Sequence, residues 1–412
     1  MSLREDAFDI MRAAIAAASP AENTARILAG LSLPESVTVL SVGKASVSMA
    51  AAAQKVLGSR IKTGLLVTKY GHTGTFSSPY FEVIEASHPV SDENSVLAAE
   101  RALEICSACG EKDTVLFLLS GGGSALLEKS GVPASVQRDI TQKLLSRGAG
   151  IEEINAVRKR MSLVKGGRLA AAAYPARVVT VALSDVLSDD PGVIASGPTV
   201  ADDTPDETVK KICRTYLSDV PENALAPLFT RETLLINDGG FYYAGNIRML
   251  CDAAVRRAAL LGYEAVCLTA ALTGEAREQP ARLLSQAGPF AGKRALICGG
   301  ETTVTLRGAG KGGRNQEMAL AAALLLDGKD NICFASVGSD GTDGPTDAAG
   351  GFADGGTRRR MVAAGLSPEE ALCSNNAYYA LKAAGDLIVT GPTGTNVNDL
   401  TLILTDMPAS GQ

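Results

Sequence analysis

TVLFLLSGGGS (residues 114–124) decides the fold class of this chain. The apolar run VLFLL predicts a strand that is buried on both faces, and a glycine-rich loop follows it at once. Buried strands of this kind that alternate with helices predict an α/β fold with a mostly parallel sheet. The same order of an apolar run and a polar or glycine-rich loop recurs in VTVLSVGK (37–44), VVTVALSDVLSDDPG (178–192), ALICGGE (295–301) and ICFASVGSDGTDG (332–344).

The chain is expected to form two dissimilar α/β domains, because 412 residues exceed what one hydrophobic core usually serves. The first half carries predicted strands at 37–43, 61–67, 82–86, 114–119 and 177–184. A second series follows segment 220–232, with predicted strands at 233–237, 263–269, 294–298, 302–307, 332–337, 386–389 and 401–405. We predict an N-terminal Rossmann-like nucleotide-binding domain over 1–230 and a C-terminal mixed-sheet domain over 231–412.

The composition excludes several classes of function. The net charge is −6, whereas a protein that binds nucleic acid or an anionic membrane normally carries a basic excess. No stretch reaches the about 18 to 20 apolar residues of a membrane-spanning helix. The N-terminus has acids where a signal peptide needs bases, and most of the eight cysteines sit in apolar segments, as reduced thiols do. We expect a cytoplasmic protein that binds neither nucleic acid nor membrane.

The loops after the predicted strands are expected to form a ligand site. Open parallel sheets bind ligands in the crevice at the carboxyl ends of their strands, so five such loops can converge on one cleft between two domains. In SGGGS, successive backbone amides and the start of a helix favour a phosphate cradle over a plain tight turn. The residues of this loop are Ser120, Gly121, Gly122, Gly123 and Ser124.

Lys44 begins a predicted helix straight after a buried strand, where a cation opposes the helix dipole. Either a functional role offsets that cost or Lys44 is a solvated loop lysine, and the residues alone leave both interpretations open.

Acidic side chains cluster in two of the loops. Asp185 and Asp189 lie in SDVLSDDPG, and Asp340 lies in GSDGTDG. Carboxylate oxygens suit Mg²⁺, which typically takes one or two of them together with phosphate oxygens. Asp, Ser and Gly also favour turns, and the spacing of these residues does not separate the two interpretations.

The segment GAGKGGRN (308–315) is compatible with two kinds of ligand. The segment follows a predicted strand and precedes a predicted helix. Gly308, Gly310 and Gly313 satisfy the pattern GxGxxG, which indicates a possible dinucleotide site. That strand, TTVTLR, alternates polar and apolar residues, unlike the buried first strand of a Rossmann unit. Arg314 at the helix start can form a fork on a phosphate oxygen. We favour phosphoryl transfer over NAD binding.

Two further segments receive minor roles. The run RKRMSLVKGGR (158–168) predicts a helix with one solvated face, from which Arg158 or Lys165 can reach an anion. His88, which follows a strand and precedes Pro89, is interpreted as a turn residue rather than a catalytic one.

Taken together, the motifs resemble the class II glycerate kinases, also called glycerate 2-kinases, which contain the MOFRL domain. The resemblance covers nearly the whole chain in the family's order, through VGKAS (42–46), SGGGSALL (120–127), NAVRKRMSLVKGGRLA (155–170), SDVLSDDPGVIASGPT (184–199), GGETTVTLRGAGKGGRNQEMAL (299–320), GSDGTDGPTDAAGG (338–351) and TGTNVNDL (393–400). It implies an active-site cleft between two α/β domains and phosphorylation of D-glycerate by ATP with Mg²⁺ to give 2-phosphoglycerate. Some members have been labelled hydroxypyruvate reductases, so NAD(P)H-dependent reduction of hydroxypyruvate is the alternative.

The resemblance also implies roles for single residues. Lys44 and Arg314 match the lysine and arginine to which the family's phosphoryl-transfer role is usually assigned. Asp189 is predicted to hold Mg²⁺ or to accept the hydroxyl proton. The predicted phosphate ligands are the SGGGS residues with Gly43, Gly310 and Gly313; the substrate ligands are Arg158, Lys165, Asn315 and Glu301; and the metal ligands are Asp185, Asp189 and Asp340. The expected partners are D-glycerate and ATP, and we allow for a homodimer.

Overall fold

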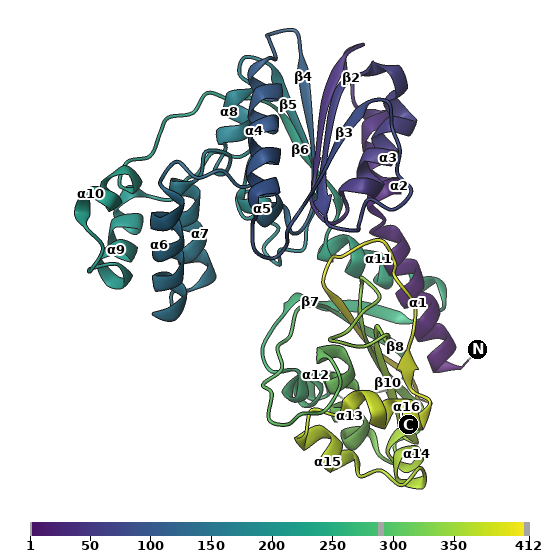
Figure 1. The fold of residues 1–412 in the computed structure, drawn as a ribbon. Coiled ribbons are helices and arrows are strands. Elements are labelled where there is room, and N and C mark those ends of the chain that lie inside the picture. Colours follow the sequence, from purple (N-terminus) through teal and green to yellow (C-terminus); the bar gives the residue numbers. More distant parts are fainter. Residues whose placement is uncertain (1, 287–291, 408–412) are drawn as a thin grey trace. The chain divides into compact units, whose positions relative to one another are not determined.

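The computed structural model describes residues 2–286 and 292–407, which form two compact units (Figure 1). The N-terminal unit runs from Pro20 to Ala244. The C-terminal unit combines Met1–Ser19 with Gly245–Gln412, so the first helix of the chain belongs to the second unit. The predicted ranges 1–230 and 231–412 therefore differ from this division at both ends of the N-terminal unit.

The N-terminal unit is built on a six-stranded sheet in the order β3-β2-β1-β4-β5-β6. β1 pairs in parallel with β2 and β4, β2 with β3, and β4 with β5, which confirms the predicted Rossmann-like parallel sheet. The strands are β1 (Val37–Val42), β2 (Ile61–Lys69), β3 (Phe81–Ala86), β4 (Thr114–Leu119), β5 (Arg177–Leu183) and β6 (Asn237–Gly245). The helices are α2 (Pro20–Gly30), α3 (Ser46–Leu57), α4 (Glu93–Ser107), α5 (Gly123–Leu126), α6 (Ala134–Ser146), α7 (Ile151–Met161), α8 (Arg168–Ala172), α9 (Asp206–Tyr216) and α10 (Glu222–Leu225), with short 3-10 turns at Gly58–Arg60, Ile194–Ser196 and Ala226–Leu228.

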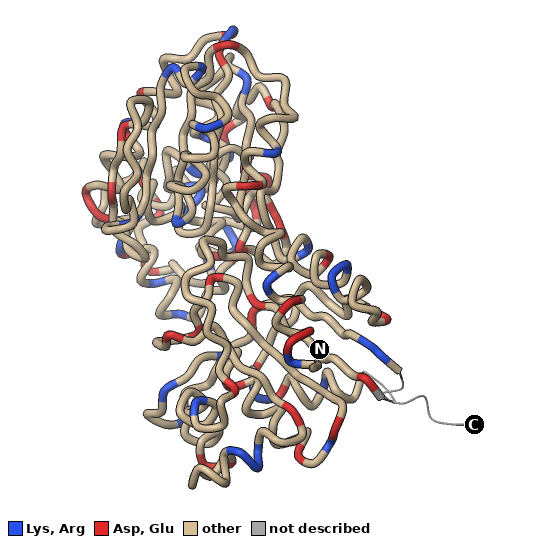
Figure 2. The backbone as a smooth tube through the Cα atoms, turned by 90° about the vertical axis from the view of Figure 1, so that its right-hand side faces the viewer, with Lys and Arg blue, Asp and Glu red and all other residues tan. Residues whose placement is uncertain are grey.

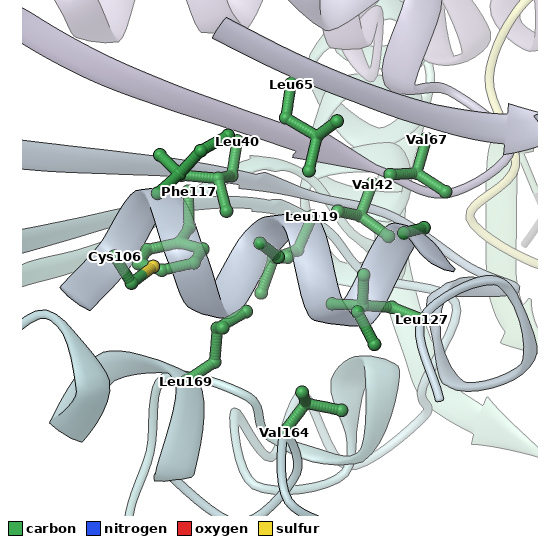
Figure 3. Packing of buried hydrophobic residues seen from close by; sticks show 14 of the residues in the cluster. Leu40, Val42, Leu65, Val67, Cys106, Phe117, Leu119, Leu127, Val164 and Leu169 are labelled. Atoms are coloured by element: carbon green, nitrogen blue, oxygen red, sulfur yellow. The ribbon is translucent and has the colours of Figure 1, made fainter. Parts of the chain in front are cut away.

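Helices cover this sheet and bury its central strands. Leu40, Phe117 and Leu119 point from the sheet toward α4, where Cys106 lies beside Phe117 (Figure 3). Leu169 of α8 packs on the same cluster. α3 packs on β1 and β2 and is itself covered by α2. The complete burial of β1 and β4 explains why their sequences are continuous apolar runs.

A smaller hydrophobic core lies in the helical part of the N-terminal unit (Figure 1). It joins α6, α7, α9 and α10, and its buried residues include Ile140, Leu144, Val157, Ile212 and Leu228. α7 carries the basic run that begins at Arg158, so this core determines where those cations point.

The C-terminal unit contains a mixed six-stranded sheet in the order β11-β10-β9-β12-β8-β7. β7 and β8 are parallel and the other neighbours are antiparallel, which confirms the predicted mixed sheet. Its strands are β7 (Glu264–Leu272), β8 (Gly292–Gly300), β9 (Ile332–Gly338), β10 (Gly350–Asp354), β11 (Leu387–Ile388) and β12 (Asp399–Met407). Its helices are α1 (Leu3–Ala17), α11 (Ile247–Leu260), α12 (Gln279–Gln286), α13 (Arg314–Leu326), α14 (Thr357–Ala363), α15 (Pro368–Cys373) and α16 (Ala377–Ala384), with a 3-10 turn at Ala276–Glu278.

Helix α1 is part of the C-terminal unit because its buried face packs on α11, β9 and β12. Ile10 and Met11 lie on that face. The Tyr263 hydroxyl donates to Asp6 Oδ2 at 2.6 Å, and the Arg257 Nε donates to Asp9 Oδ2 at 2.8 Å. These contacts bind the start of the chain to residues about 250 positions later.

Two predicted strands differ from the structure, and one observed strand was not predicted. The strand expected at 233–237 is β6, which begins at Asn237 and completes the N-terminal sheet. Segment 302–307 is not a strand, because apart from one isolated bridge at Thr303 it is a loop. β10 was not predicted, because its Gly350-Gly351 start lacks the apolar signal of a strand.

Charges of both signs are interspersed along the backbone of both units (Figure 2). Across the two described ranges, no helix has the length and apolar character needed to cross a membrane.

Candidate active site

The loops after β1 and β4 are locked together by Ser120. Gly43 has φ 126°, and a Cβ on it would lie 2.2 Å from Ser120 Oγ, so only glycine fits there. Ser120 Oγ accepts from the Ala45 amide at 3.0 Å, and the Lys44 amide donates to the Gly121 carbonyl at 2.9 Å. Because Ser120 is 1% exposed, its side chain shapes the loop, and a phosphate contact from it stays a prediction.

Gly121 and Gly122 form the accessible part of the SGGGS loop. A Cβ on Gly121 would lie 2.2 Å from Asp185 Oδ2, so a carboxylate from the β5 loop lies directly against this glycine. Gly122 has φ 86°, and a Cβ there would lie 3.3 Å from Lys44 Cγ. Among the residues that the structure describes, the amides of these two glycines donate to no protein acceptor. Lys44, Asp185 and two free amides therefore meet at one sheet edge, which suits an anion together with a cation.

The helix after SGGGS contributes less to anion binding than the sequence predicted. α5 has four residues, so it offers only one turn of aligned peptide dipoles. Ser124 Oγ shares a hydrogen bond of 2.8 Å with Ser196 Oγ, and a Cβ on Gly123 would lie 2.8 Å from Ala195 Cβ. Anion binding at this loop therefore depends on the amides of Gly121 and Gly122 rather than on the helix.

The acidic loop after β5 combines turn chemistry with carboxylates. Asp189 has φ 53°, in the left-handed region, and its carbonyl accepts a hydrogen bond from the Tyr243 hydroxyl. Asp190 Oδ1 accepts from the Gly192 amide at 2.8 Å, as turn residues do. This fixed loop conformation is what brings Asp185 against Gly121.

Arg158 and Lys165 both meet Glu128, which was not predicted. The Lys165 ammonium donates to Glu128 Oε2, and Arg158 lies 3.7 Å from the same oxygen. Lys165 is 1% exposed, and burial lowers its pKa to about 8 although the charge of Glu128 opposes that shift. Two cations share one carboxylate here, so a net positive charge remains in the cluster, and their contact with substrate stays a prediction.

Two further cations of the basic run, Lys159 and Arg160, are buried, which makes the prediction of a solvated helix face wrong. Lys159 is 8% exposed and Arg160 is 6% exposed. Arg160 Nε donates to Asp202 Oδ2 at 2.9 Å, and Lys159 Nζ lies 3.7 Å from the other Asp202 oxygen. Asp202 is about forty positions away in the sequence, so local charge patterning did not reveal the pairing.

Arg314 is the first residue of α13 and is held by two carboxylates. Its Nε and one terminal nitrogen donate to the two Asp399 oxygens at 2.5 and 3.0 Å, and the other terminal nitrogen lies 2.8 Å from Glu301 Oε1. Burial opposes charge on the guanidinium, but the hydrogen bonds and charge of Asp399 outweigh it, so the pKa of Arg314 is raised. The structure thus brings the predicted residues Arg314 and Glu301 together and adds Asp399, which was not in the predicted set.

The start of α13 is capped by Asp343 from the GSDGTDG loop. Its carboxylate accepts from the Asn315 amide at 3.1 Å and from the Gln316 amide at 2.8 Å. A Cβ on Gly313 would lie 2.3 Å from Asp343 Cγ, so the glycine makes room for this cap. Burial raises the pKa of Asp343 to about 7, although the two amide hydrogen bonds favour the ionised form. Asp343 therefore fixes the backbone next to Arg314.

Asn315 and Asp340 are engaged within the C-terminal unit. Asn315 Nδ2 donates to Asp343 Oδ1 at 3.2 Å, and its Oδ1 accepts from the Ser336 hydroxyl at 2.6 Å. Asp340 Oδ1 accepts from the Thr342 amide at 2.9 Å, which is a turn contact. In the parts of the chain that the structure describes, no three His, Cys, Asp or Glu residues are grouped to hold a metal ion. The predicted substrate and metal roles of Asn315 and Asp340 stay predictions.

The GAGKGG loop uses its glycines to pack against protein. Cβ atoms on Gly308 and Gly310 would lie 2.6 and 2.5 Å from the Ser374 carbonyl oxygen. The Gly308 amide donates to Asn375 Oδ1 at 3.1 Å, and the Gly310 amide donates to the Ser374 carbonyl at 3.0 Å. A dinucleotide fingerprint instead follows a buried strand and leaves its amides for a pyrophosphate. Neither condition holds here.

Comparison with known proteins identifies two matching family models and several similar chains. Residues 6–228 match a domain of unknown function (DUF4147), and residues 294–399 match the MOFRL family. A D-glycerate 2-kinase of Thermotoga maritima is 44% identical over 97% of this chain and 97% of its own length. A glycerate 2-kinase of Pyrococcus horikoshii is 41% identical over 89% of this chain and 87% of its own length. A putative hydroxypyruvate reductase of Agrobacterium vitis is 42% identical over 89% of this chain and 98% of its own length.

The fold is also that of a solved enzyme. The crystal structure of a glycerate kinase from Thermotoga maritima has a TM-score of 0.92 at 43% identity and covers 98% of this chain and 99% of its own. The DUF4147 match covers β1 to β5 of the parallel sheet, and the MOFRL match covers most of β8 and all of β9, β10 and β11 of the mixed sheet. The chain therefore belongs to the glycerate 2-kinase family, in which a DUF4147 domain is joined to a MOFRL domain.

Proposed function

We propose that this chain transfers the γ-phosphoryl group of ATP to the 2-hydroxyl of D-glycerate, giving 2-phosphoglycerate and ADP. The observation that carries the proposal is the meeting of Lys44, Asp185 and the free amides of Gly121 and Gly122 at one sheet edge in a member of this family. Backbone amides and a lysine are the groups that bind nucleotide phosphates.

In the proposed reaction the hydroxyl oxygen forms a bond to the γ-phosphorus, and the bond from that phosphorus to the bridging oxygen of ADP breaks. Negative charge is spread over the transferred phosphoryl oxygens, so fixed cations supply much of the catalysis. We assign this role to Lys44 and Arg314. Asp189 is our candidate for the group that accepts the hydroxyl proton.

The residues of the N-terminal unit fit a Mg²⁺ ion bound together with the nucleotide. Mg²⁺ usually keeps several waters and takes one or two carboxylates plus phosphate oxygens, so it does not need a cluster of three acids. Asp185 lies against Gly121 and offers a carboxylate at the proposed phosphate site, with Asp189 on the same loop. When bound, the ion would neutralise charge on the nucleotide phosphates.

Hydroxypyruvate reduction is the alternative function, and some relatives carry that name. Two features of the GAGKGG loop argue against it. Segment 302–307 is not a strand, and the amides of Gly308 and Gly310 are already hydrogen-bonded to protein. We therefore favour the kinase.

We also infer a cytoplasmic location, because all eight cysteines are free thiols. A homodimer stays a prediction.

The proposal is tested by measuring ADP release with a coupled assay in the presence of MgCl₂ and ATP, with and without D-glycerate. A parallel reaction follows NADH and NADPH oxidation with hydroxypyruvate. We expect ADP release that depends on glycerate, no reductase signal, and 2-phosphoglycerate as the product by phosphorus NMR. Reductase turnover without kinase turnover would overturn the proposal, and 3-phosphoglycerate would overturn the assignment of the 2-hydroxyl.

A further inference from the structure

His88 lies in the loop after β3, at the same edge of the parallel sheet as the SGGGS loop. A Cβ on Gly122 would lie 3.0 Å from His88 Cδ2 and 3.2 Å from His88 Nε2. The same Cβ would lie 3.3 Å from Lys44 Cγ. The imidazole and the lysine stem therefore flank one glycine, whose amide is free for a ligand.

The surroundings of His88 favour the neutral imidazole, which can donate one hydrogen bond. It is half-buried, and no residue in the described parts of the chain forms a hydrogen bond with it. Burial lowers the pKa of His88, and the charges of Lys44 and Lys69 lower it further. A neutral imidazole has one nitrogen that donates and one that accepts. It can thus stand beside Lys44 without like-charge repulsion.

We propose that His88 is a phosphate-binding residue, whose Nε2–H donates to a non-bridging phosphate oxygen of the nucleotide held at Gly121 and Gly122. The inference rests on the proposed function for the identity of the nucleotide. Lys44 supplies charge to that phosphate, and His88 supplies a directed hydrogen bond that fixes its orientation. The turn role inferred from the His88-Pro89 sequence does not explain an imidazole that lies against the SGGGS loop with no protein partner.

The two histidines of the chain offer a matched pair of variants. A glutamine amide reaches the position of Nε2 and still donates a hydrogen bond, whereas alanine does not. The informative variants are therefore H88A and H88Q. H72Q is the control, because His72 is exposed and is not among the atoms next to Gly122.

The first readout is binding of MgADP by isothermal titration calorimetry. Losing a hydrogen bond to a charged phosphate should weaken binding by about 10- to 100-fold in H88A. H88Q should keep most of the affinity, and H72Q should bind as the parent protein does. Equal MgADP affinity in the parent protein and in H88A would overturn the proposal. A loss of kcat that is equal in H88A and H88Q, with MgADP affinity unchanged, would also overturn it and would indicate a proton acceptor instead.

The second readout is NMR of the imidazole nitrogens in the parent protein labelled with ¹⁵N-histidine. H72Q is used only to assign the two sets of ring signals, so this readout does not require H88A or H88Q to fold. MgADP should move the His88 ring signals and leave those of His72 nearly in place. If the parent protein fails to phosphorylate glycerate but MgADP moves the His88 signals, the proposed function fails and the phosphate contact stands. If glycerate is phosphorylated and MgADP leaves the His88 signals unmoved, the contact is refuted and the kinase stands.

Discussion

Arg314 and Asp399 form a two-pronged ion pair, with nitrogen–oxygen distances of 2.5 and 3.0 Å. Asp399 is the first residue of β12 and is 5% exposed, while about a third of the Arg314 side chain remains accessible. The buried carboxylate of Asp399 therefore holds one edge of the guanidinium, Glu301 pairs with the remaining terminal nitrogen, and the accessible third of the side chain can meet a ligand. This orientation is what a transition-state arginine requires.

Replacing Asp399 by asparagine should lower kcat by about 10- to 100-fold, because one charged hydrogen bond that orients Arg314 is lost. The KM for D-glycerate should change less than kcat. Steady-state kinetics of D399N test this. D406N is the control, since Asp406 lies on the same strand but is exposed. A D399N enzyme with the parent kcat would show that the ion pair does not matter for catalysis.

Replacing Arg314 by alanine should lower kcat by about 10³-fold or more. It should also destabilise the fold by about 3 to 5 kcal/mol, because Asp399 would be left buried without its main cation. The double variant R314A/D399N should recover stability but not activity. Urea unfolding and initial rates measured on both variants separate the two effects. Recovery of activity in the double variant would refute the catalytic role of Arg314.

Asp343 should give the stability of the protein a pH dependence. Its pKa is near 4 in the unfolded chain and about 7 in the folded one, so the folded state binds more protons between these values. The free energy of unfolding should therefore fall as pH rises from about 4 to 7, by about 1 to 4 kcal/mol relative to D343N. Chemical denaturation across this range checks the slope. A D343N slope equal to the parent slope would contradict the prediction.

Replacing Lys44 by methionine should lower kcat by about 10²- to 10³-fold with little loss of stability, since the side chain is exposed and its removal leaves no buried acid. K55M is the matched control, because Lys55 is exposed in the last turn of helix α3. Thermal melts and kinetics on both variants check the prediction. If K44M and K55M retain equal kcat, Lys44 is the solvated loop lysine that the sequence also permitted.

Replacing Asp185 by asparagine should raise the Mg²⁺ concentration needed for half-maximal activity by about tenfold, since one carboxylate ligand is lost. D340N is the comparison, because Asp340 is the predicted metal ligand of the GSDGTDG loop and one of its oxygens already accepts the Thr342 amide in a turn. Activity measured against MgCl₂ at fixed ATP compares the two variants. A larger shift in D340N than in D185N would move the metal site to the GSDGTDG loop.

The parallel sheet could be predicted because each buried strand corresponds to a continuous apolar run in the sequence. VTVLSV and TVLFLL are buried on both faces, so their apolar runs coincide with β1 and β4 to within one residue. The segment TTVTLR gave a false strand for the opposite reason. Its Thr305 amide bonds to the Glu275 carboxylate and its Arg307 amide to Asn375 Oδ1, which are side chains remote in the sequence. Such contacts leave no periodic pattern.

The candidate site shows the same limit. Glycine-rich loops after strands identified Gly121 and Gly122, because backbone chemistry is visible in composition. Glu128 and the pairing of Asp399 with Arg314 were not predicted, since each carboxylate meets its cation only through the fold. The local sequence of His88 indicates a turn. Its proximity to Gly122 joins the β3 loop to the β4 loop, and such a contact between distant segments is not visible in the sequence around His88.

Helix α1 packs on α11, β9 and β12, although the whole N-terminal unit separates α1 from these three elements in the sequence. β12 is an inner strand between β9 and β8, so the sheet of the C-terminal unit cannot close before the final strand has emerged. The N-terminal unit is one continuous segment and can fold while the rest is still being made. The apolar face of α1, with Ile10 and Met11, is therefore synthesised well before its packing partners and stays without them while the N-terminal unit is made.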